Sequence, residues 1–165
     1  EETCMAQDLE ARMQALEAQV QVLNDREAVR ALRYRYHECI NEGKLAEIPD
    51  LFTADGDLDF GYLGKAHGKA ELTKFFDGVS QLLSFVKQFV HNHVVELAGE
   101  GGTGFSYLEA KTIAKGEPYL VAARYNDEYA KENGQWKFKK MHLTPYFAVP
   151  LKEGWAQEDR LKMGR

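Results

Sequence analysis

The sequence predicts one α+β domain, and three features of the chain support that fold class. Apolar residues at helical spacing fill the first quarter of the 165 residues. Four long segments with alternating side chains fill the second half. The last two of these segments are joined by Asn133-Gly134, a strong hairpin signal because both residues tolerate the positive φ of a type I′ turn. Helices followed by a meander of long strands indicate α+β architecture with a core of ordinary size.

An amphipathic helix is predicted over residues 5–24. Its apolar residues are spaced 4-3-4-3, as in two heptads, which are too few for an independent coiled coil. We therefore expect this helix to pack on its own domain or on a second subunit, and an ordinary amphipathic helix fits the pattern equally well. The apolar residues are Leu9, Met13, Leu16, Val20 and Leu23.

The flanks of this helix are also interpreted from the sequence. Residues 24–27 predict a helix break, with Asp25 as the N-cap of the next helix. Residues 1–4 precede Met5 and are interpreted as the remnant of an expression tag.

The predicted domain covers residues 25–150, and a tail follows over 151–165. Its first helix, 25–42, has an apolar face that includes Val29, Leu32 and Tyr36. The tail is polar apart from Trp155, and we expect it to wrap the surface or a partner. The remaining predicted elements are a short helix at 44–52, a strand at 57–63, a helix at 69–82, and strands at 85–98, 102–115, 118–131 and 135–148.

Composition narrows the classes of function. The net charge of −5, with 28% charged residues, argues against nucleic acid as a partner. The sequence contains neither an apolar run near 18 residues nor a leader pattern, so we expect a cytoplasmic protein without a membrane partner. Cys4 and Cys39 do not predict a disulfide. Phosphate-loop, dinucleotide-binding, Cys-x-x-Cys and Gly-x-Ser-x-Gly motifs are absent, and we predict no cofactor.

The closing hairpin carries a family resemblance. Its Tyr125-x-Asp127, followed by Asn133-Gly134 and then Trp136, is similar to the hairpin of SnoaL-like proteins in the nuclear-transport-factor-2-like superfamily. Further similar segments occur in the same order between about residues 25 and 148, at 51–60, 68–72 and 91–93. The resemblance implies a cystatin-like cone, a curved mixed or antiparallel sheet wrapped around N-terminal helices. It also implies a homo-oligomer, either a dimer through the outer sheet face or a trimer.

Tyr36 and Asn41 are the first candidate catalytic residues. Among enzymes of this superfamily, the chain most resembles the bile acid 7α-dehydratases, which carry a pocket tyrosine followed by an acidic residue. Tyr36 matches the tyrosine, whereas Asn41 stands where the acid would be. A buried phenol can donate a proton or hold an oxyanion, and an amide can hydrogen-bond but cannot take a proton. A core tyrosine is the alternative interpretation of Tyr36.

Three histidines are candidates for general acid–base catalysis. We expect His91 and His93 to share one strand face with Phe89, and His142 to share a face with Trp136. The alternatives are a dimer interface for the first two and a satisfied core histidine for the third. The sequence places no third ligand near His91 and His93, so we predict no metal.

Candidate substrate-binding residues are mostly aromatic, as expected for a site that holds a ring-shaped compound. Arg124 would hold an acidic group of the substrate, or alternatively pair with Glu109. A plain core position is the alternative for each aromatic residue. The candidates are Phe60, Tyr62, Phe89, Tyr107, Arg124, Trp136 and Tyr146.

Together these features predict a cofactor-independent lyase or isomerase. It would eliminate water or formaldehyde from, or isomerise, a hydrophobic hydroxylated cyclic or aromatic small molecule by acid–base catalysis. One alternative is a ligand-binding or scaffold subunit without catalytic activity. Another is a polyketide cyclase or epoxide hydrolase, although the sequence lacks a convincing Asp pair for epoxide hydrolysis.

Overall fold

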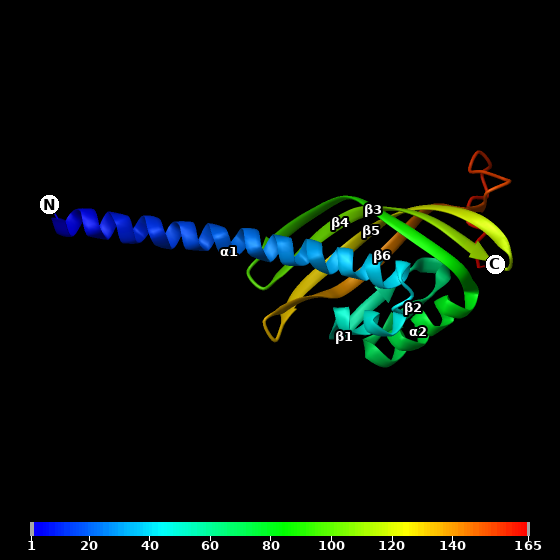
Figure 1. Cartoon of the computed structure of the whole chain (residues 1–165), viewed down its shortest axis with the longest axis horizontal. Helices are drawn as coiled ribbons and strands as arrows, with labels where there is room; N and C mark the ends of the chain where they lie inside the picture. Colours follow the sequence, from blue (N-terminus) through cyan, green and yellow to red (C-terminus); the bar gives the residue numbers. More distant parts are fainter. Residues whose placement is uncertain (1, 165) are drawn as a thin grey trace.

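A computed structural model describes residues 2–164, with side chains described from residue 5 onward; Glu1 and the side chains of residues 2–4, where the tag remnant was predicted, lie outside the described part. Two α-helices, two short 3-10 helices and six strands make up the described chain (Figure 1). Their bounds are α1 Glu2–Asn41, η1 Leu45–Leu51, β1 Phe52–Asp59, η2 Gly61–Leu63, β2 Lys65–His67, α2 Gly68–Leu82, β3 Leu83–Ala98, β4 Gly101–Ala114, β5 Glu117–Glu132 and β6 Gln135–Pro150.

The six strands form one curved mixed sheet in the order β2-β1-β6-β5-β4-β3. Strands β3 to β6 are an antiparallel meander, and β1 joins β6 in parallel. The second half of α1, together with η1 and α2, covers the inner face of the sheet (Figure 1). This arrangement confirms the predicted cystatin-like cone.

The core lies between these helices and the sheet. Val29 and Tyr36 of α1 are almost fully buried, as are Phe52 of β1, Leu72 of α2 and Phe138 of β6. Burial of one such side chain stabilises the fold by about 1.5–3 kcal/mol relative to exposure. The apolar stripe predicted for residues 25–42 is therefore the face that joins α1 to the sheet.

Helix α1 runs without interruption through the break predicted at residues 24–27, so that prediction is wrong. Asp25 does not cap a helix. Its carboxylate accepts a hydrogen bond from Trp136 Nε1 at 2.7 Å and pairs with Lys131 Nζ at 2.8 Å. Neither Gly nor Pro occurs between residues 5 and 42 to interrupt the helix. The side chain of Asp25, predicted to be an N-cap, thus makes tertiary contacts instead.

A β-bulge separates His91 from His93, so the prediction that they share a face is wrong. His91 pairs with Tyr107, but Val94 pairs with Phe105, which leaves one extra residue in β3. Asn92 has a φ of 51°, in the left-handed region that Asn tolerates better than most residues. The extra residue reverses the alternation, so His91 points outward and His93 points inward.

A second bulge, in β6, reverses the alternation around His142. Tyr129 pairs with Phe138 and Glu128 pairs with Lys140, so Lys139 is the extra residue. Trp136 and Phe138 point inward before the bulge, and Met141 points inward after it. His142 therefore lies on the outer face, opposite to its predicted side.

Two shorter differences concern the first strand. It begins at Phe52 rather than at residue 57, because Phe52 pairs in parallel with Phe138. It is followed by the three-residue strand β2, which was not predicted.

The tail after β6 folds back on the domain, where Lys162 N donates to Ala148 O at 2.9 Å.

Candidate functional site

A cavity of about 580 Å³ opens between the C-terminal half of α1, helix α2 and the inner face of the sheet. Its walls are mainly apolar and include Phe60, Phe75, Val86 and Leu108. The tail closes one side with Met163, whose sulfur accepts a hydrogen bond from Thr112 Oγ1 at 3.4 Å. This volume suits a small ring compound.

The ionisable side chains around the cavity fall into two groups. Lys65, Glu71 and Lys74 are exposed, so they lie where the cavity meets solvent. Tyr36 and Tyr125 lie on the inner wall and are almost completely buried. The interior of the cavity is thus apolar, with two phenols as its ionisable groups.

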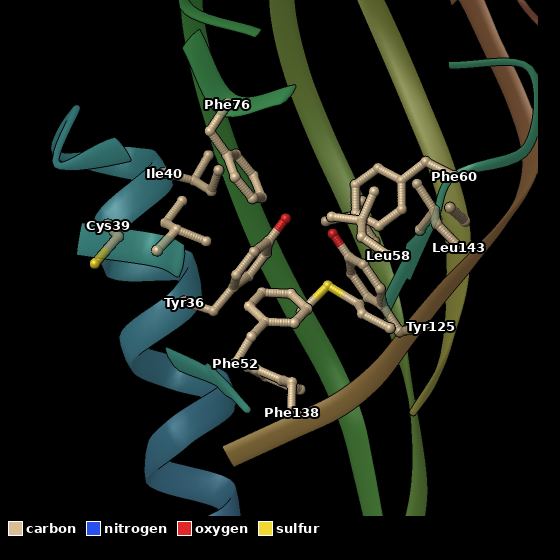
Figure 2. Packing of buried hydrophobic residues seen from close by; sticks show 14 of the residues in the cluster. Tyr36, Cys39, Ile40, Phe52, Leu58, Phe60, Phe76, Tyr125, Phe138 and Leu143 are labelled. Atoms are coloured by element: carbon tan, nitrogen blue, oxygen red, sulfur yellow. The ribbon is translucent and has the colours of Figure 1, made fainter. Parts of the chain in front are cut away.

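The two phenols come from facing elements, Tyr36 from α1 and Tyr125 from β5. Their ring centroids are 6.2 Å apart in an edge-to-face arrangement. Figure 2 shows both hydroxyl groups directed toward the same space between the helices and the sheet. The hydroxyl of Tyr125 is buried without a well-formed hydrogen bond, and the hydroxyl of Tyr36 is its polar neighbour. An oxygen atom of a ligand in the cavity would satisfy this unpaired donor.

Burial keeps both phenols protonated. It raises the pKa of Tyr125 to about 12, although the positive charge of Arg33 acts in the opposite direction. It raises the pKa of Tyr36 well above the usual tyrosine value, and the neighbouring Tyr125 adds to the rise. At neutral pH the pair can therefore donate hydrogen bonds or a proton, but cannot act as a base.

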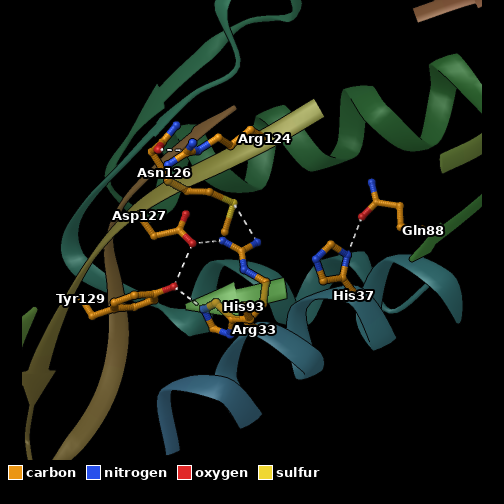
Figure 3. A network of polar contacts seen from close by, with 9 residues as sticks. Arg33, His37, Gln88, His93, Arg124, Asn126, Asp127 and Tyr129 are labelled. Atoms are coloured by element: carbon orange, nitrogen blue, oxygen red, sulfur yellow. Dashed lines mark hydrogen bonds and ion pairs between the residues drawn. The ribbon is translucent and has the colours of Figure 1, made fainter. Parts of the chain in front are cut away.

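Behind the tyrosines lies a polar cluster, which we define as Arg33, His37, His93, Asp127 and Tyr129 (Figure 3). Arg33 and Asp127 form a fully buried ion pair. Tyr129 donates its hydroxyl hydrogen to Asp127 Oδ2 at 2.8 Å and accepts a hydrogen bond from His93 Nε2 at 3.0 Å. Burial alone would lower the pKa of Arg33, but the carboxylate of Asp127 raises it above its usual value.

Arg33 connects the polar cluster to the cavity. Its guanidinium lies 4.2 Å from the centroid of the Tyr125 ring, 4.6 Å from Phe138 and 5.3 Å from Tyr36. Such cation–π contacts are strong where water is excluded. The charge thus fixes the rings whose hydroxyl groups face the cavity.

The two histidines of the polar cluster are neutral. His37 Nδ1 lies 2.9 Å from Gln88 Oε1, and because an amide oxygen only accepts, Nδ1 carries the proton. Burial and the charge of Arg33 lower the pKa of His37 to about 3 and that of His93 to about 4. Neither ring lines the cavity, but Gln88 contacts both His37 and the cavity.

The predicted catalytic residues are dispersed. Tyr36 lines the cavity, whereas His93 lies in the polar cluster. His91 and His142 are on the outer face, within 3.8 Å of Glu109 and 3.7 Å of Asp59, respectively. The structure therefore does not bring the three histidines together with Tyr36.

Asn41 closes the outer edge of β3 rather than lining the cavity. Its Nδ2 donates to Gln88 O at 2.9 Å, and its Oδ1 accepts from Gln88 N at 2.6 Å. The amide thus satisfies both backbone groups at an edge position that has no neighbouring strand. An acid at this position would lack the donor that Gln88 O requires.

Of the predicted substrate-binding residues, Phe60 lines the cavity. Arg124 lies on the outer face, with its guanidinium 4.2 Å from the centroid of Phe105, and its Nε donates to Asn126 rather than to Glu109. Trp136 is buried near the point where α1 leaves the domain. The other four predicted residues do not line the cavity: they are Tyr62, Phe89, Tyr107 and Tyr146.

Sequence reasoning missed Arg33, His37, Gln88 and the cavity role of Tyr125. A signal for the first was available: Asp127 alternates with two tyrosines on one strand face, and a carboxylate buried among aromatic rings requires a cation. Among residues 5–164, no group of three or more His, Cys, Asp or Glu side chains is arranged to hold a metal ion. Within the same range, no helix is long and apolar enough to cross a membrane.

The chain belongs to the SnoaL-like domain family, which matches residues 21–142. Solved structures share the fold at low identity. A protein from Novosphingobium aromaticivorans, provisionally named scytalone dehydratase, superposes with a TM-score of 0.72 at 18% identity, covering 87% of this chain and 95% of that one.

Two further structures are similar. The hexachlorocyclohexane dehydrochlorinase LinA-type3 from Novosphingobium barchaimii gives a TM-score of 0.73 at 18% identity, covering 78% of this chain and 91% of that one. A Nostoc punctiforme protein of unknown function with a cystatin-like fold gives 0.64 at 21% identity, covering 73% and 90%. At these identities the similarity establishes the fold.

Proposed function

We propose that this protein is a cofactor-independent lyase or isomerase for a hydrophobic, hydroxylated cyclic or aromatic small molecule. One observation carries the proposal: Tyr36 and Tyr125 place neighbouring hydroxyl groups on the wall of an apolar cavity, and the buried hydroxyl of Tyr125 has no well-formed hydrogen bond. Groups placed in this way stabilise an oxygen that gains negative charge as a bond to it breaks or as a carbonyl enolises. The low polarity of the surroundings strengthens that interaction.

The tyrosine pair supplies the acidic half of such a reaction. In a dehydration, one phenol gives its proton to the departing hydroxyl group as the C–O bond breaks, and the phenolate so formed takes up the proton that leaves the neighbouring carbon as the double bond forms, so that the net change is loss of water. No imidazole or carboxylate lies on the inner wall among the described residues. The chemistry therefore favours substrates whose C–H bond is already acidic, beside a carbonyl or an aromatic ring.

Two similar structures support this class of reaction. They are named as a dehydratase and a dehydrochlorinase, and both names denote eliminations that form a double bond. The similarity is distant, so it supports the type of reaction rather than a particular substrate.

A ligand-binding protein without catalytic activity is the second candidate. The observation that favours it is the lack of a base on the inner cavity wall, where both phenols stay protonated. Such a site would hold a hydroxylated ring compound through the same two hydrogen bonds.

The test is turnover by the purified protein of a panel of hydroxylated steroids, diaryl diols and β-hydroxy ketones, followed by mass spectrometry. We expect loss of water or formaldehyde, or isomerisation, from at least one compound. We expect the rate to fall about 10²–10⁴-fold in Tyr36→Phe, because a positioned acid contributes by that factor. Tyr34→Phe is the matched control, because this tyrosine lies on the same helix but is half exposed.

Two outcomes would change the assignment. Turnover that survives Tyr36→Phe would keep the activity but remove this phenol from the reaction. Saturable binding of a panel compound without turnover would favour the ligand-binding candidate.

A further inference from the structure

The N-terminal half of α1 leaves the domain as a free helix with an exposed apolar row. Figure 1 shows this segment projecting beyond the end of the sheet. The side chains of the row are between 53% and 61% exposed, and it continues the heptad pattern over five positions. Exposed apolar rows of this length are typical of surfaces that bind another protein. The row consists of Leu9, Met13, Leu16, Val20 and Leu23, and we call it the seam.

The domain to which the helix belongs cannot cover the seam. With about 100° of rotation per residue, Leu16 and Leu23 lie on roughly the opposite side of α1 from Val29 and Tyr36, which face the sheet. Asp25 holds the helix where it leaves the domain, through Trp136 and Lys131. The seam thus points away from the molecule, and packing on its own domain is excluded.

We propose that a second copy of this chain covers the seam in a parallel, two-stranded coiled coil. Leucine occupies all three d positions, at 9, 16 and 23, and Val20 is β-branched at an a position. Leucine at d with β-branched residues at a favours two strands in parallel coiled coils. The sequence pattern therefore identifies both the kind of partner and the number of helices.

Charges beside the seam set the direction of the two helices. Glu10 and Glu17 occupy e positions, and Arg12 and Arg26 occupy g positions. In a parallel pair, each g residue faces the e residue five positions further along the partner helix, so Arg12 meets the partner's Glu17 twice. An antiparallel pair would place e beside e and g beside g, bringing acids near acids and bases near bases. Charge complementarity thus selects the parallel arrangement.

The seam is short for a coiled coil, but the helix that carries it is anchored in the folded domain. Residues 5–24 span roughly 30 Å of helix, and an isolated helix of this length is marginal in water. Here the helix continues from the part of α1 that is packed in the core, so its nucleation is already complete. Two heptads can therefore associate where a free peptide would not, and both domains lie at the same end of the coiled coil.

The test is the oligomeric state of the full chain by sedimentation velocity over a concentration series. We expect a dimer whose dissociation constant rises at least about 100-fold in Leu16→Glu, because two charges would enter the apolar seam. Leu16 is exposed in the single chain, so this change leaves the domain folded. Ala18→Glu is the matched control: it adds the same charge one half-turn away, on the side opposite the seam, and should leave the dimer intact.

Orientation is tested by cross-linking through Leu9→Cys in a Cys4→Ser background, where Cys39 is fully buried. Identical d positions of parallel helices lie within reach of a disulfide, so oxidation should give a covalent dimer. A monomeric wild type, a dimer unaffected by Leu16→Glu, or a trimer would each overturn the proposal. A dimer sensitive to Leu16→Glu that does not cross-link would overturn the parallel arrangement.

Discussion

The polar cluster and the cavity lie side by side between α1 and the sheet, yet their contents are opposite. The cluster contains the buried ion pair of Arg33 and Asp127 and two neutral histidines. The cavity contains about 580 Å³ of space, apolar walls and two protonated phenols. The charged residue pair and the histidines of the cluster thus contact one another or their neighbours rather than the cavity, whose inner wall carries neutral hydrogen-bond donors.

The two regions meet at Arg33, which stacks against the rings of Tyr36 and Tyr125. Substitutions in the polar cluster should therefore lower the free energy of unfolding, whereas substitutions on the cavity wall should leave the fold intact. The predictions below separate the regions by that criterion, from the largest effect to the smallest.

The largest effect is expected for Asp127→Ala. It would leave the charge of Arg33 buried without a counter-charge, and breaking a buried ion pair in this way costs about 3–5 kcal/mol. Urea unfolding followed by circular dichroism measures the loss. Glu128→Ala is the control, since the next side chain makes only an exposed 3.9 Å pair with Lys140 and should change stability by less than about 1 kcal/mol. A loss below about 1 kcal/mol for Asp127→Ala would show that the ion pair does not stabilise this region.

Asn41→Ala should have the next largest effect, at about 1–3 kcal/mol. It would leave the N–H and C=O groups of Gln88 without partners at the edge of β3. Hydrogen exchange should show faster exchange in β3 than in β5, and Glu42→Ala is the exposed neighbouring control. Equal stability of the two variants would contradict the role assigned to Asn41.

Acid should weaken the polar cluster before carboxylates titrate. His37 binds a proton near pH 6.5 when unfolded but only near pH 3 when folded, so stability is present above pH 6.5 and is lost as pH falls through this range. Between pH 7.5 and pH 5.5 the free energy of unfolding should drop by about 1.4 kcal/mol through this residue. The half-buried His93 shifts in the same direction with a smaller effect.

His37→Gln should reduce the drop between pH 7.5 and pH 5.5 by about that amount, measured by urea unfolding at both values. His91→Gln, which removes an exposed histidine of β3, is the control. An identical pH dependence of wild type and His37→Gln would mean that this ring is not held neutral.

The smallest effect is expected on the cavity wall, at Gly78 of α2. An added Cβ there would meet open space, so Gly78→Ala should raise stability by about 0.5–1 kcal/mol through helix propensity alone. Gly104→Ala is the contrasting change, because its Cβ would lie 2.6 Å from Val94 O in the sheet. In thermal unfolding, the midpoint temperature should rise for Gly78→Ala and fall for Gly104→Ala. A lower midpoint for Gly78→Ala would contradict the open space beside this residue.

Periodicity and turn chemistry predicted most of the architecture. The helical stripe with Tyr36 and the Asn133-Gly134 hairpin are confirmed. These features depend on local patterns of period 3.6 or 2, which a single sequence displays directly.

The site was less predictable because two β-bulges decide which side chains face inward. One extra residue, Asn92 in β3 or Lys139 in β6, reverses the alternation of the side chains that follow it. His93 therefore faces away from the side of Phe89, and His142 away from the side of Trp136, contrary to the prediction. Neither bulge carries a strong local signal. Likewise, Asp25 resembles a helix cap, but a contact with Trp136, 111 residues away in sequence, determines its role.

The measurement that most directly tests the central claim is the rate of product formation at saturating substrate for wild type and Tyr125→Phe. If the hydroxyl of Tyr125 stabilises the reacting oxygen, the rate should fall about 10²-fold or more, and the unfolding temperature should stay the same. The fall should appear in kcat rather than only in KM, because the hydrogen bond is strongest in the transition state. An unchanged kcat in Tyr125→Phe would contradict the account.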